Sequence, residues 1–239
     1  MSNSSLVDCT VKSPNHSGAR THSIDRITPH CVVGQLTAES IGGCFTSTSR
    51  QASCNYGIGK DGRVVLCVDE GNRSWCSSSN ANDQRAVTIE CASDLNHPYA
   101  MNNAVYQKLI TLCVDICKRN GKTKLIWLGD KNKTLAYEPK AGEMVLTVHR
   151  WFANKACPGD WLYNRLGDLA AAVTAKLGGT SSTGTSGLQA TSLKDMENAD
   201  IIKKIGSLFT ADQKNSSVLA SVSLAQFIPF SYTHLTLPT

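Results

Sequence analysis

The 239-residue sequence has no run of apolar residues long enough to cross a bilayer as a helix, so we expect no membrane insertion. Its N-terminus, MSNSSLVDCTVKSPNHSG, is polar and lacks the basic stretch followed by an apolar stretch that marks a secretory signal. We therefore expect a protein that is made in a cytoplasm without a signal peptide of its own.

The sequence also lacks any Cys-x-x-Cys pair, although it contains 10 cysteines. Cys67, Cys91 and Cys113 lie inside apolar stretches. A disulfide framework is not expected in a chain of this length without a signal peptide. We interpret most of the cysteines as reduced, buried, small hydrophobic residues.

Runs of Lys or Arg are missing too, and the net charge of +5 is only mildly basic. A nucleic-acid partner is therefore not predicted. A polyanionic surface such as a bacterial cell wall would suit the same charge. Nothing in the sequence indicates an oligomer, and we expect a monomer.

Residues 1–178 are predicted to form one α/β domain, a mixed central β-sheet flanked by helices, because strand-like and helix-like segments alternate along them. The predicted strands are 27–35, 85–93, 123–129, 143–150 and a hairpin over 55–69. Three helices are predicted in this domain. The first begins near Thr37, the second covers 102–121 and ends at Gly121, and the third covers 159–179 with Asp160 as its N-cap.

The remaining residues differ in composition. A Gly/Ser/Thr linker is predicted over 179–191, followed over 192–228 by two amphipathic helices that are too short to bury a core of their own. Residues 229–239, PFSYTHLTLPT, have no helical period after a Pro that interrupts an apolar helix.

The segment TVHRWFANKACPGDWL, residues 147–162, carries a His and a Cys with seven residues between them, at the end of a predicted strand. His149 and Cys157 could both reach one metal ion, and His30 in TPHC could supply a third ligand. Cys31 is an alternative from the same strand, but adjacent strand residues face opposite ways and we prefer His30. Two imidazoles and a thiolate suit Zn²⁺ better than Mg²⁺ or Ca²⁺.

Five motifs occur in order along residues 5–178: TPHCVVGQ, SCNYGIGKDGRV, AVTIECASD, LIWLGDK and VLTVHRWFANKACPGDWL. Together they resemble the zinc-dependent N-acetylmuramoyl-L-alanine amidases, the family that includes phage endolysins and peptidoglycan-recognition proteins. The resemblance implies that His30, His149 and Cys157 bind Zn²⁺. It also implies that the substrate is peptidoglycan, cut at the amide between the lactyl group of N-acetylmuramic acid and L-alanine.

Three further residues are candidates for the chemistry. Glu90 alternates with apolar Val87 and Ile89, so its carboxylate is expected on the opposite face, where partial burial would suit it as general base. Lys155, two residues before a zinc ligand of the family, is expected to stabilise the oxyanion. Tyr56 matches a Tyr that some members of the family keep near the metal. Either Tyr56 or Glu90 could therefore act as the general base, and both alternatives stay open.

The sequence also offers candidates for residues that contact the substrate. Trp75 and Trp151 are expected to line a groove for sugar and peptide, whereas Trp127 is expected in the core. Arg73 and Asn82, which precede the Glu90 strand, are candidates for contacting substrate.

The C-terminal helices, up to SLAQFI, resemble the start of a bacterial endo-β-N-acetylglucosaminidase domain. That family continues with a Glu-Ser-Gly motif, whereas this sequence continues with Pro229, Phe230 and Ser231, so no glycosidase activity is predicted. Residues 229–239 resemble translated sequencing-adaptor sequence, and we interpret them as a non-native tail.

Two other functions compete with the amidase. The first is a peptidoglycan-binding module of the same fold without catalysis, but such proteins lose the Cys ligand that is present here as Cys157. The second is a cysteine peptidase, in which the Cys usually precedes the His, whereas Cys157 follows His149. The absent signal peptide suits a phage lysin that reaches the wall through a pore; a bacterial autolysin exported by another route stays open.

Overall fold

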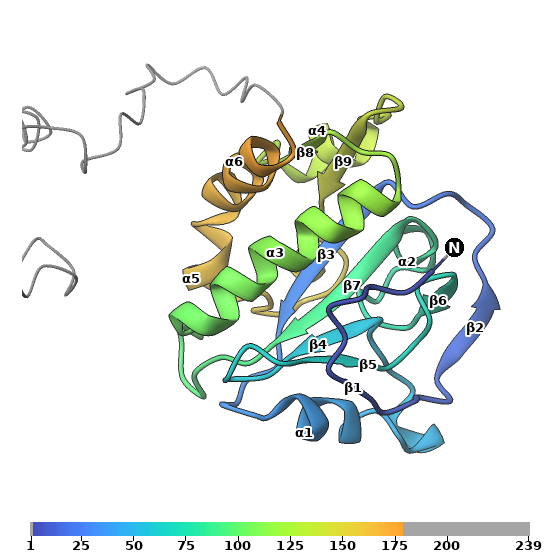
Figure 1. Cartoon of the computed structure of the whole chain (residues 1–239), viewed down its shortest axis with the longest axis vertical. Helices are drawn as coiled ribbons and strands as arrows, with labels where there is room; N and C mark the ends of the chain where they lie inside the picture. Colours follow the sequence, from blue (N-terminus) through green and yellow to red (C-terminus); the bar gives the residue numbers. More distant parts are fainter. Residues whose placement is uncertain (1, 179–239) are drawn as a thin grey trace, which may run out of the picture. The chain divides into compact units, whose positions relative to one another are not determined.

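The computed structural model describes residues 2–178, and the predicted linker, helical fragment and tail lie outside the described residues. None of the described helices is long and apolar enough to cross a membrane. The secondary structure within residues 2–178 is that of a mixed α/β domain (Figure 1).

A seven-stranded sheet forms the centre of the domain, in the order β1-β5-β4-β7-β3-β9-β8. Its strands are β1 (Cys9–Thr10), β3 (Arg26–Cys31), β4 (Tyr56–Ile58), β5 (Val64–Leu66), β7 (Ala86–Cys91), β8 (Lys124–Ile126) and β9 (Glu143–Leu146). β4 and β5 pair antiparallel as the predicted hairpin, and the other neighbours pair parallel. The predicted mixed α/β fold is therefore confirmed.

A second, two-stranded antiparallel sheet joins β2 (His16–Ala19) to β6 (Asn72–Ser74). The helices are α1 (Ala38–Gly43), α2 (Asn80–Arg85), α3 (Asn103–Arg119), α4 (Lys131–Ala136), α5 (Asp160–Tyr163) and α6 (Leu166–Lys176), with 3₁₀ turns η1 (Thr48–Arg50) and η2 (His149–Trp151).

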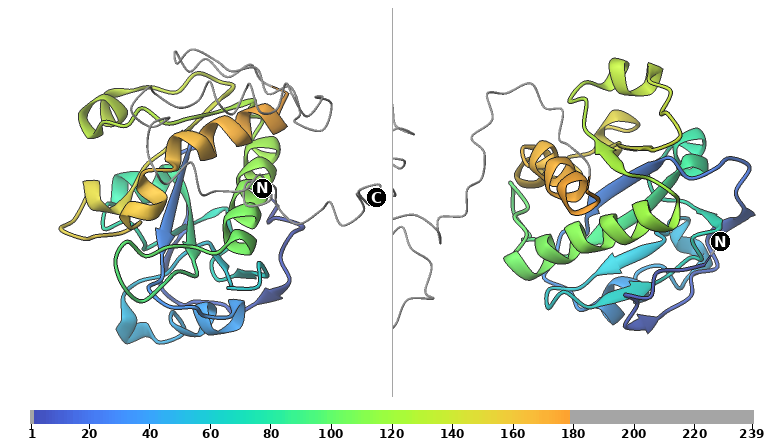
Figure 2. Two further views of the ribbon diagram at one scale, coloured as in Figure 1. Left: turned by 90° about the vertical axis from the view of Figure 1, so that its left-hand side faces the viewer. Right: turned by 45° about the horizontal axis from the view of Figure 1, so that its top comes forward.

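Helix α3 crosses one face of the sheet and α6 packs beside it (Figures 1 and 2). The apolar stripe of α3 is buried as predicted, at Val105, Leu109, Leu112, Cys113, Ile116 and Cys117. Gly121 ends the helix as predicted, with a positive φ of 66°. The amides of Gly121 and Lys122 donate to the carbonyls of Lys118 and Cys117, the paired bonds of a Schellman motif.

Two predicted boundaries are wrong in the segment that carries His149 and Cys157. The strand expected over 143–150 ends at Leu146, and His149 begins the 3₁₀ turn η2 instead. The helix expected over 159–179 is two helices, α5 and α6. Asp160 is not the N-cap, because α5 already begins at Asp160 and Gly159 is the N-cap. The Asp160 carboxylate instead accepts from His97 and pairs with Arg150. The strands predicted over 27–35 and 123–129 also end early, at Cys31 and Ile126.

Gly57 of β4 occupies a position that a side chain cannot fill. A Cβ atom there would lie 2.6 Å from a methyl carbon of Ile41 in α1 and 2.8 Å from one of Val65 in β5. The missing side chain thus lets α1 pack directly against the sheet, on the face opposite the neighbouring Tyr56.

We expect Gly57→Ala to lower the free energy of unfolding by about 1–3 kcal/mol, because the added methyl group overpacks the contact between α1 and the sheet. Gly43→Ala is the matched control, since a Cβ there meets no atom within 4 Å and alanine favours the helix by up to about 1 kcal/mol. Urea unfolding of both variants measures the difference, and equal stabilities would contradict this account of the packing.

Candidate metal centre

Parallel pairing of β3 and β7 places His30 directly opposite Glu90 in the register. Residues paired in this way project from the same face of a sheet, so the imidazole and the carboxylate point into the same space. The His30 side chain is 1% exposed and that of Glu90 is 14% exposed. Oε1 of Glu90 lies 4.0 Å from Nδ1 of His30.

His149 and Cys157 reach this space from the loop that follows β9. β9 pairs with β3, so the chain leaves the sheet beside the strand that carries His30. The loop is closed by a backbone hydrogen bond in which the Arg150 amide donates to the Cys157 carbonyl over 3.1 Å. This closure explains why two residues that are eight positions apart bring their side chains together.

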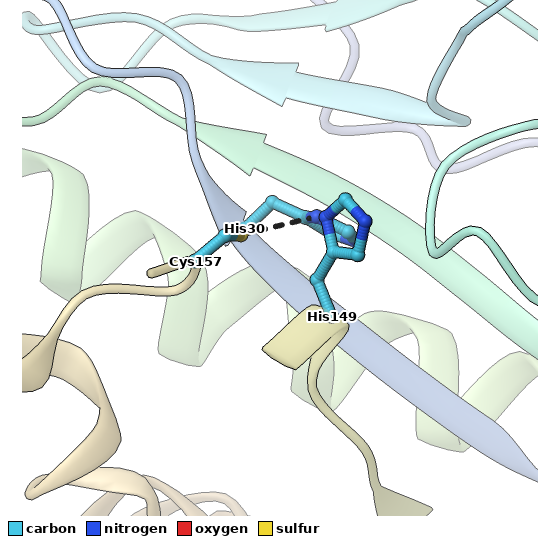
Figure 3. Close-up of side chains that lie close together, drawn as sticks. All are labelled: His30, His149 and Cys157. Carbon is cyan, nitrogen blue, oxygen red and sulfur yellow. Dashed lines mark hydrogen bonds between the residues drawn. The ribbon is translucent and has the colours of Figure 1, made fainter. Parts of the chain in front are cut away.

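His30, His149 and Cys157 form a cluster whose candidate ligand atoms all lie within 4.8 Å of one another (Figure 3). Sγ of Cys157 lies 3.3 Å from Nδ1 of His30, and the two imidazole centroids are 5.1 Å apart. Ligands about 2.0–2.3 Å from a tetrahedral zinc ion lie about 3.5 Å from each other. The donor set and its spacing therefore fit a transition-metal ion.

Both imidazoles are held in the neutral form that binds metals. Burial, with a smaller effect of His149, lowers the pKa of His30 to about 3. Burial and the charge of Lys155 lower the pKa of His149. Nε2 of His30 is buried without a hydrogen-bond partner among the described residues, and Ser78 Oγ lies 2.8 Å from Nε2 of His149. Nδ1 of His30 is the ring nitrogen that faces Cys157 and Glu90, so the neutral ring can offer its lone pair there to an ion. Ser78 orients the second ring.

Glu90 is poised to exchange a proton near neutral pH. Burial raises the pKa of its carboxyl to about 7, against the opposing influences of the Arg50 charge and of contact with Cys76. Within the described part of the chain, Oε2 has no hydrogen-bond partner. A carboxyl group with these properties, 4.0 Å from a candidate ligand, suits general acid–base work.

A cavity of about 800 Å³ opens at this cluster and contains all three candidate ligands and Glu90. Lys155 also lines it, as do Arg73 and Trp75 from the region of β6. Cys31 lines the cavity as well, so both residues of the His30-Cys31 pair border it, although only His30 belongs to the cluster of possible ligands.

The structure does not bring Tyr56 to the cluster. Tyr56 pairs with Ile89, whereas its neighbour Gly57 pairs with Glu90, so Tyr56 faces the opposite side of the sheet. Its hydroxyl donates to Glu70 over 2.7 Å and accepts from the Ser4 amide, and Tyr56 does not line the cavity. This position does not support the expected role of Tyr56 near the metal.

Two candidates for substrate contact also lie elsewhere. Trp151 is 7% exposed and stacks on Trp127 at a centroid distance of 5.2 Å, rather than lining the groove. Asn82 is buried, accepts from Arg26 and Thr147, and donates to Thr28. Both residues support the architecture around the cavity.

Cys76 is a residue of the site that the sequence does not mark. Its Sγ lies 3.9 Å from Oε1 of Glu90, and His30, Cys76 and Glu90 form a second cluster within 4.8 Å. Asp83 holds the segment in place, because its carboxylate accepts from the amides of Cys76 and Ser77. No spacing rule connects Cys76 with the distant motifs, so only the folded chain shows it.

Residues 20–160, more than half of the chain, match the family model described as N-acetylmuramoyl-L-alanine amidase. The chain belongs to the N-acetylmuramoyl-L-alanine amidase family. No curated protein matches the sequence.

Several solved structures are similar to this chain at low sequence identity. A selenomethionine derivative of AmpD is 18% identical, with a TM-score of 0.50, over 70% of this chain and 96% of that one. The endolysin and amidase LysCS from Clostridium intestinale is 17% identical, with a TM-score of 0.45, over 73% and 98% of the two chains. A mutant endolysin from Bacillus subtilis is 13% identical, with a TM-score of 0.44, over 70% and 99%.

We expect His149→Ala and Cys157→Ser to lower the affinity for a divalent transition-metal ion by more than about 100-fold, since losing even an outer-shell partner costs about 10–100-fold. Elemental analysis after dialysis against zinc measures the bound metal. His22→Ala, which removes an exposed imidazole outside the cavity, is the control and should bind as the original chain does. Undiminished metal in both site variants would rule out this ligand set.

Proposed function

We propose that the chain is a zinc-dependent peptidoglycan hydrolase that cleaves the amide between N-acetylmuramic acid and the L-alanine of the stem peptide. The observation that carries this proposal is the convergence of His30, His149 and Cys157 beside Glu90 in one cavity of an amidase-family fold. The proposed substrate is cell-wall peptidoglycan, and the proposed ligands of Zn²⁺ are these two His and one Cys.

A zinc ion held there would lower the pKa of a coordinated water to about 7 and polarise the carbonyl of the scissile amide. Two neutral imidazoles and one thiolate would supply three protein ligands, the number found in catalytic rather than structural zinc sites. The pKa of His30, lowered to about 3, keeps its ring in the ligand form over the whole physiological range.

Glu90 would move the proton during hydrolysis. With a pKa raised to about 7, its carboxyl group can accept a proton from the attacking water and deliver it to the departing amine nitrogen. Its unpartnered Oε2 leaves one oxygen free for this exchange, because no neighbouring donor among residues 2–178 holds it.

Lys155 would stabilise the negative charge that develops on the carbonyl oxygen. It lines the same cavity and lies two residues before Cys157. Burial and, to a smaller extent, the charge of Lys155 lower the pKa of His149, which supports an electrostatic role for Lys155 at the centre. A positive charge placed in advance where the oxyanion forms lowers the barrier without reorganisation.

The cavity is large enough for part of a glycopeptide, and Trp75 with Arg73 forms one part of its lining. Ser17 of β2 fixes both side chains, since its Oγ accepts from the Trp75 indole over 2.7 Å and from the Arg73 guanidinium. An oriented indole suits stacking on a sugar ring, and we propose that Trp75 does so.

Mass spectrometry of digested peptidoglycan tests the proposed bond. We expect free stem peptides with an N-terminal L-alanine and glycan strands that keep intact lactyl groups. Chelation of zinc should abolish their release, and added zinc should restore it. Binding to cell walls without any release would instead favour a non-catalytic module, and cleavage at another bond would refute the proposed specificity.

We expect Glu90→Gln to retain zinc but to lower kcat by about 10²–10⁴-fold, the usual contribution of a general acid–base group. Release of stem peptides from purified muropeptides gives the rate, and elemental analysis gives the zinc content. Glu138→Gln is the matched control, since Glu138 is 80% exposed and does not line the cavity. Near-normal turnover in Glu90→Gln would exclude Glu90 as the base while leaving the zinc site intact.

A further inference from the structure

Four non-glycine residues in the described part of the chain have a positive φ: Val33 at 56°, Gln51 at 50°, Ser78 at 61° and Tyr99 at 58°. Three of the four, Val33, Gln51 and Ser78, line the cavity at the candidate metal centre. Residues with a side chain rarely adopt this left-handed conformation, and it is least favourable for a β-branched residue such as valine. Backbone strain of this kind concentrates at functional sites, and Val33 is the strongest case here.

The side chain of Val33 is exposed as well as strained. Val33 is 43% exposed, and the other large apolar residue that is exposed within residues 2–178 is Leu95, at 70%. Leu95 does not line the cavity and has no positive φ. A single exposed leucine is ordinary on a protein surface. An exposed valine with a strained backbone in the wall of a cavity is not, and it indicates a functional contact.

Hydrogen bonds on both sides hold Val33 in this conformation. The amide of Val32 donates to the Cys91 carbonyl over 2.9 Å, and the Val33 amide donates to Oγ of Ser93 over 3.2 Å. The Ser93 amide in turn donates to the Gly34 carbonyl over 3.0 Å. The chain is thus tied to the end of β7 before and after Val33. The valine side chain is therefore held at the cavity wall before any ligand arrives.

Val33 also lies close to the reacting centre along the chain. It follows His30 by three residues, so the two Cα atoms are at most about 11 Å apart. An apolar side chain at that distance is near enough to contact the part of a substrate that flanks the scissile bond. In the proposed substrate, two methyl groups flank the amide, one on the lactyl group and one on the L-alanine.

We propose that Val33 determines substrate specificity by contacting one of the two methyl groups that flank the scissile amide. The strained backbone is retained because it holds the valine side chain against the substrate. The identity of the substrate rests on the proposed function, whereas the strain and the exposure of Val33 do not. An apolar contact with one methyl group favours the methyl-bearing substrate by about 10–200-fold in kcat/KM.

Three synthetic N-acetylmuramoyl peptides test the contact. The first carries the lactyl group and L-alanine, the second has glycine in place of L-alanine, and the third has a methyl-free carboxymethyl ether in place of the lactyl ether. The full chain, loaded with zinc, should cleave the first with a kcat/KM at least about tenfold above that of the second or of the third. The disfavoured substrate identifies the methyl group that Val33 contacts.

Val33→Ala and Val33→Gly should bring this preference close to equality by lowering kcat/KM for the substrates that carry the contacted methyl group. The rate for the substrate that lacks it should change little, and the zinc content should stay that of the original chain. A purely structural role of Val33 would instead lower the rates for all three substrates together.

Thermal unfolding tests the strain independently of activity. Glycine adopts a positive φ without steric conflict, so Val33→Gly should melt at a higher temperature than Val33→Ala. Leu95→Gly and Leu95→Ala are the matched controls, because Leu95 is an exposed apolar residue with no positive φ. At that position the glycine variant should melt below the alanine variant, and both should keep the original preference among the three substrates.

An unchanged preference in Val33→Gly and Val33→Ala would overturn the contact, and a lower melting temperature of Val33→Gly than of Val33→Ala would overturn the strain. If the original chain cleaves all three substrates equally well, the proposed function stands and only the role of Val33 fails. If the original chain cleaves none of them at the amide, the proposed function fails, and with it the methyl contact assigned to Val33.

Discussion

The parallel register between β3 and β7 is the constraint on which the candidate site depends. Because His30 pairs with Glu90, a buried imidazole and a buried carboxyl share one face of the sheet and one small space. A shift of one residue would turn one of the two side chains to the opposite face, where α3 packs. The low pKa of His30 and the raised pKa of Glu90 both follow from that shared burial.

The same register decides which sequence-based predictions succeed. Alternation along a single strand correctly separates Glu90 from Val87 and Ile89, because it needs no knowledge of the neighbouring strand. It cannot place Tyr56, whose face depends on pairing with β7 across 33 positions of sequence. Tyr56 instead belongs to a buried network in which Glu70 accepts two hydrogen bonds from Arg119. The mixed α/β fold and the buried stripe of α3 were predictable, because both rest on local periodicity.

The ligand set was suggested by the spacing of His149 and Cys157 and by the resemblance of the motifs, and the folded chain brings its members together. Cys76, Ser78 and Asp83 could not be inferred, because their contacts to Glu90, His149 and the backbone join segments with no common sequence pattern. The end of β9 was misplaced for a related reason. The apolar alternation continues through Val148, while β9 stops at Leu146 and η2 begins at His149.

The backbone bond from Arg150 to Cys157 has a consequence for the thermodynamics of the centre. Two of the three proposed ligands sit on a short loop that closes on itself, and the third lies in a strand that is hydrogen-bonded on both sides. Little chain entropy is then left to lose when an ion arrives, because folding has already ordered the donors. With zinc bound as proposed, the centre would be a preorganised chelate, in which the protein holds the geometry for the metal, unlike a zinc finger, in which the metal holds the protein together.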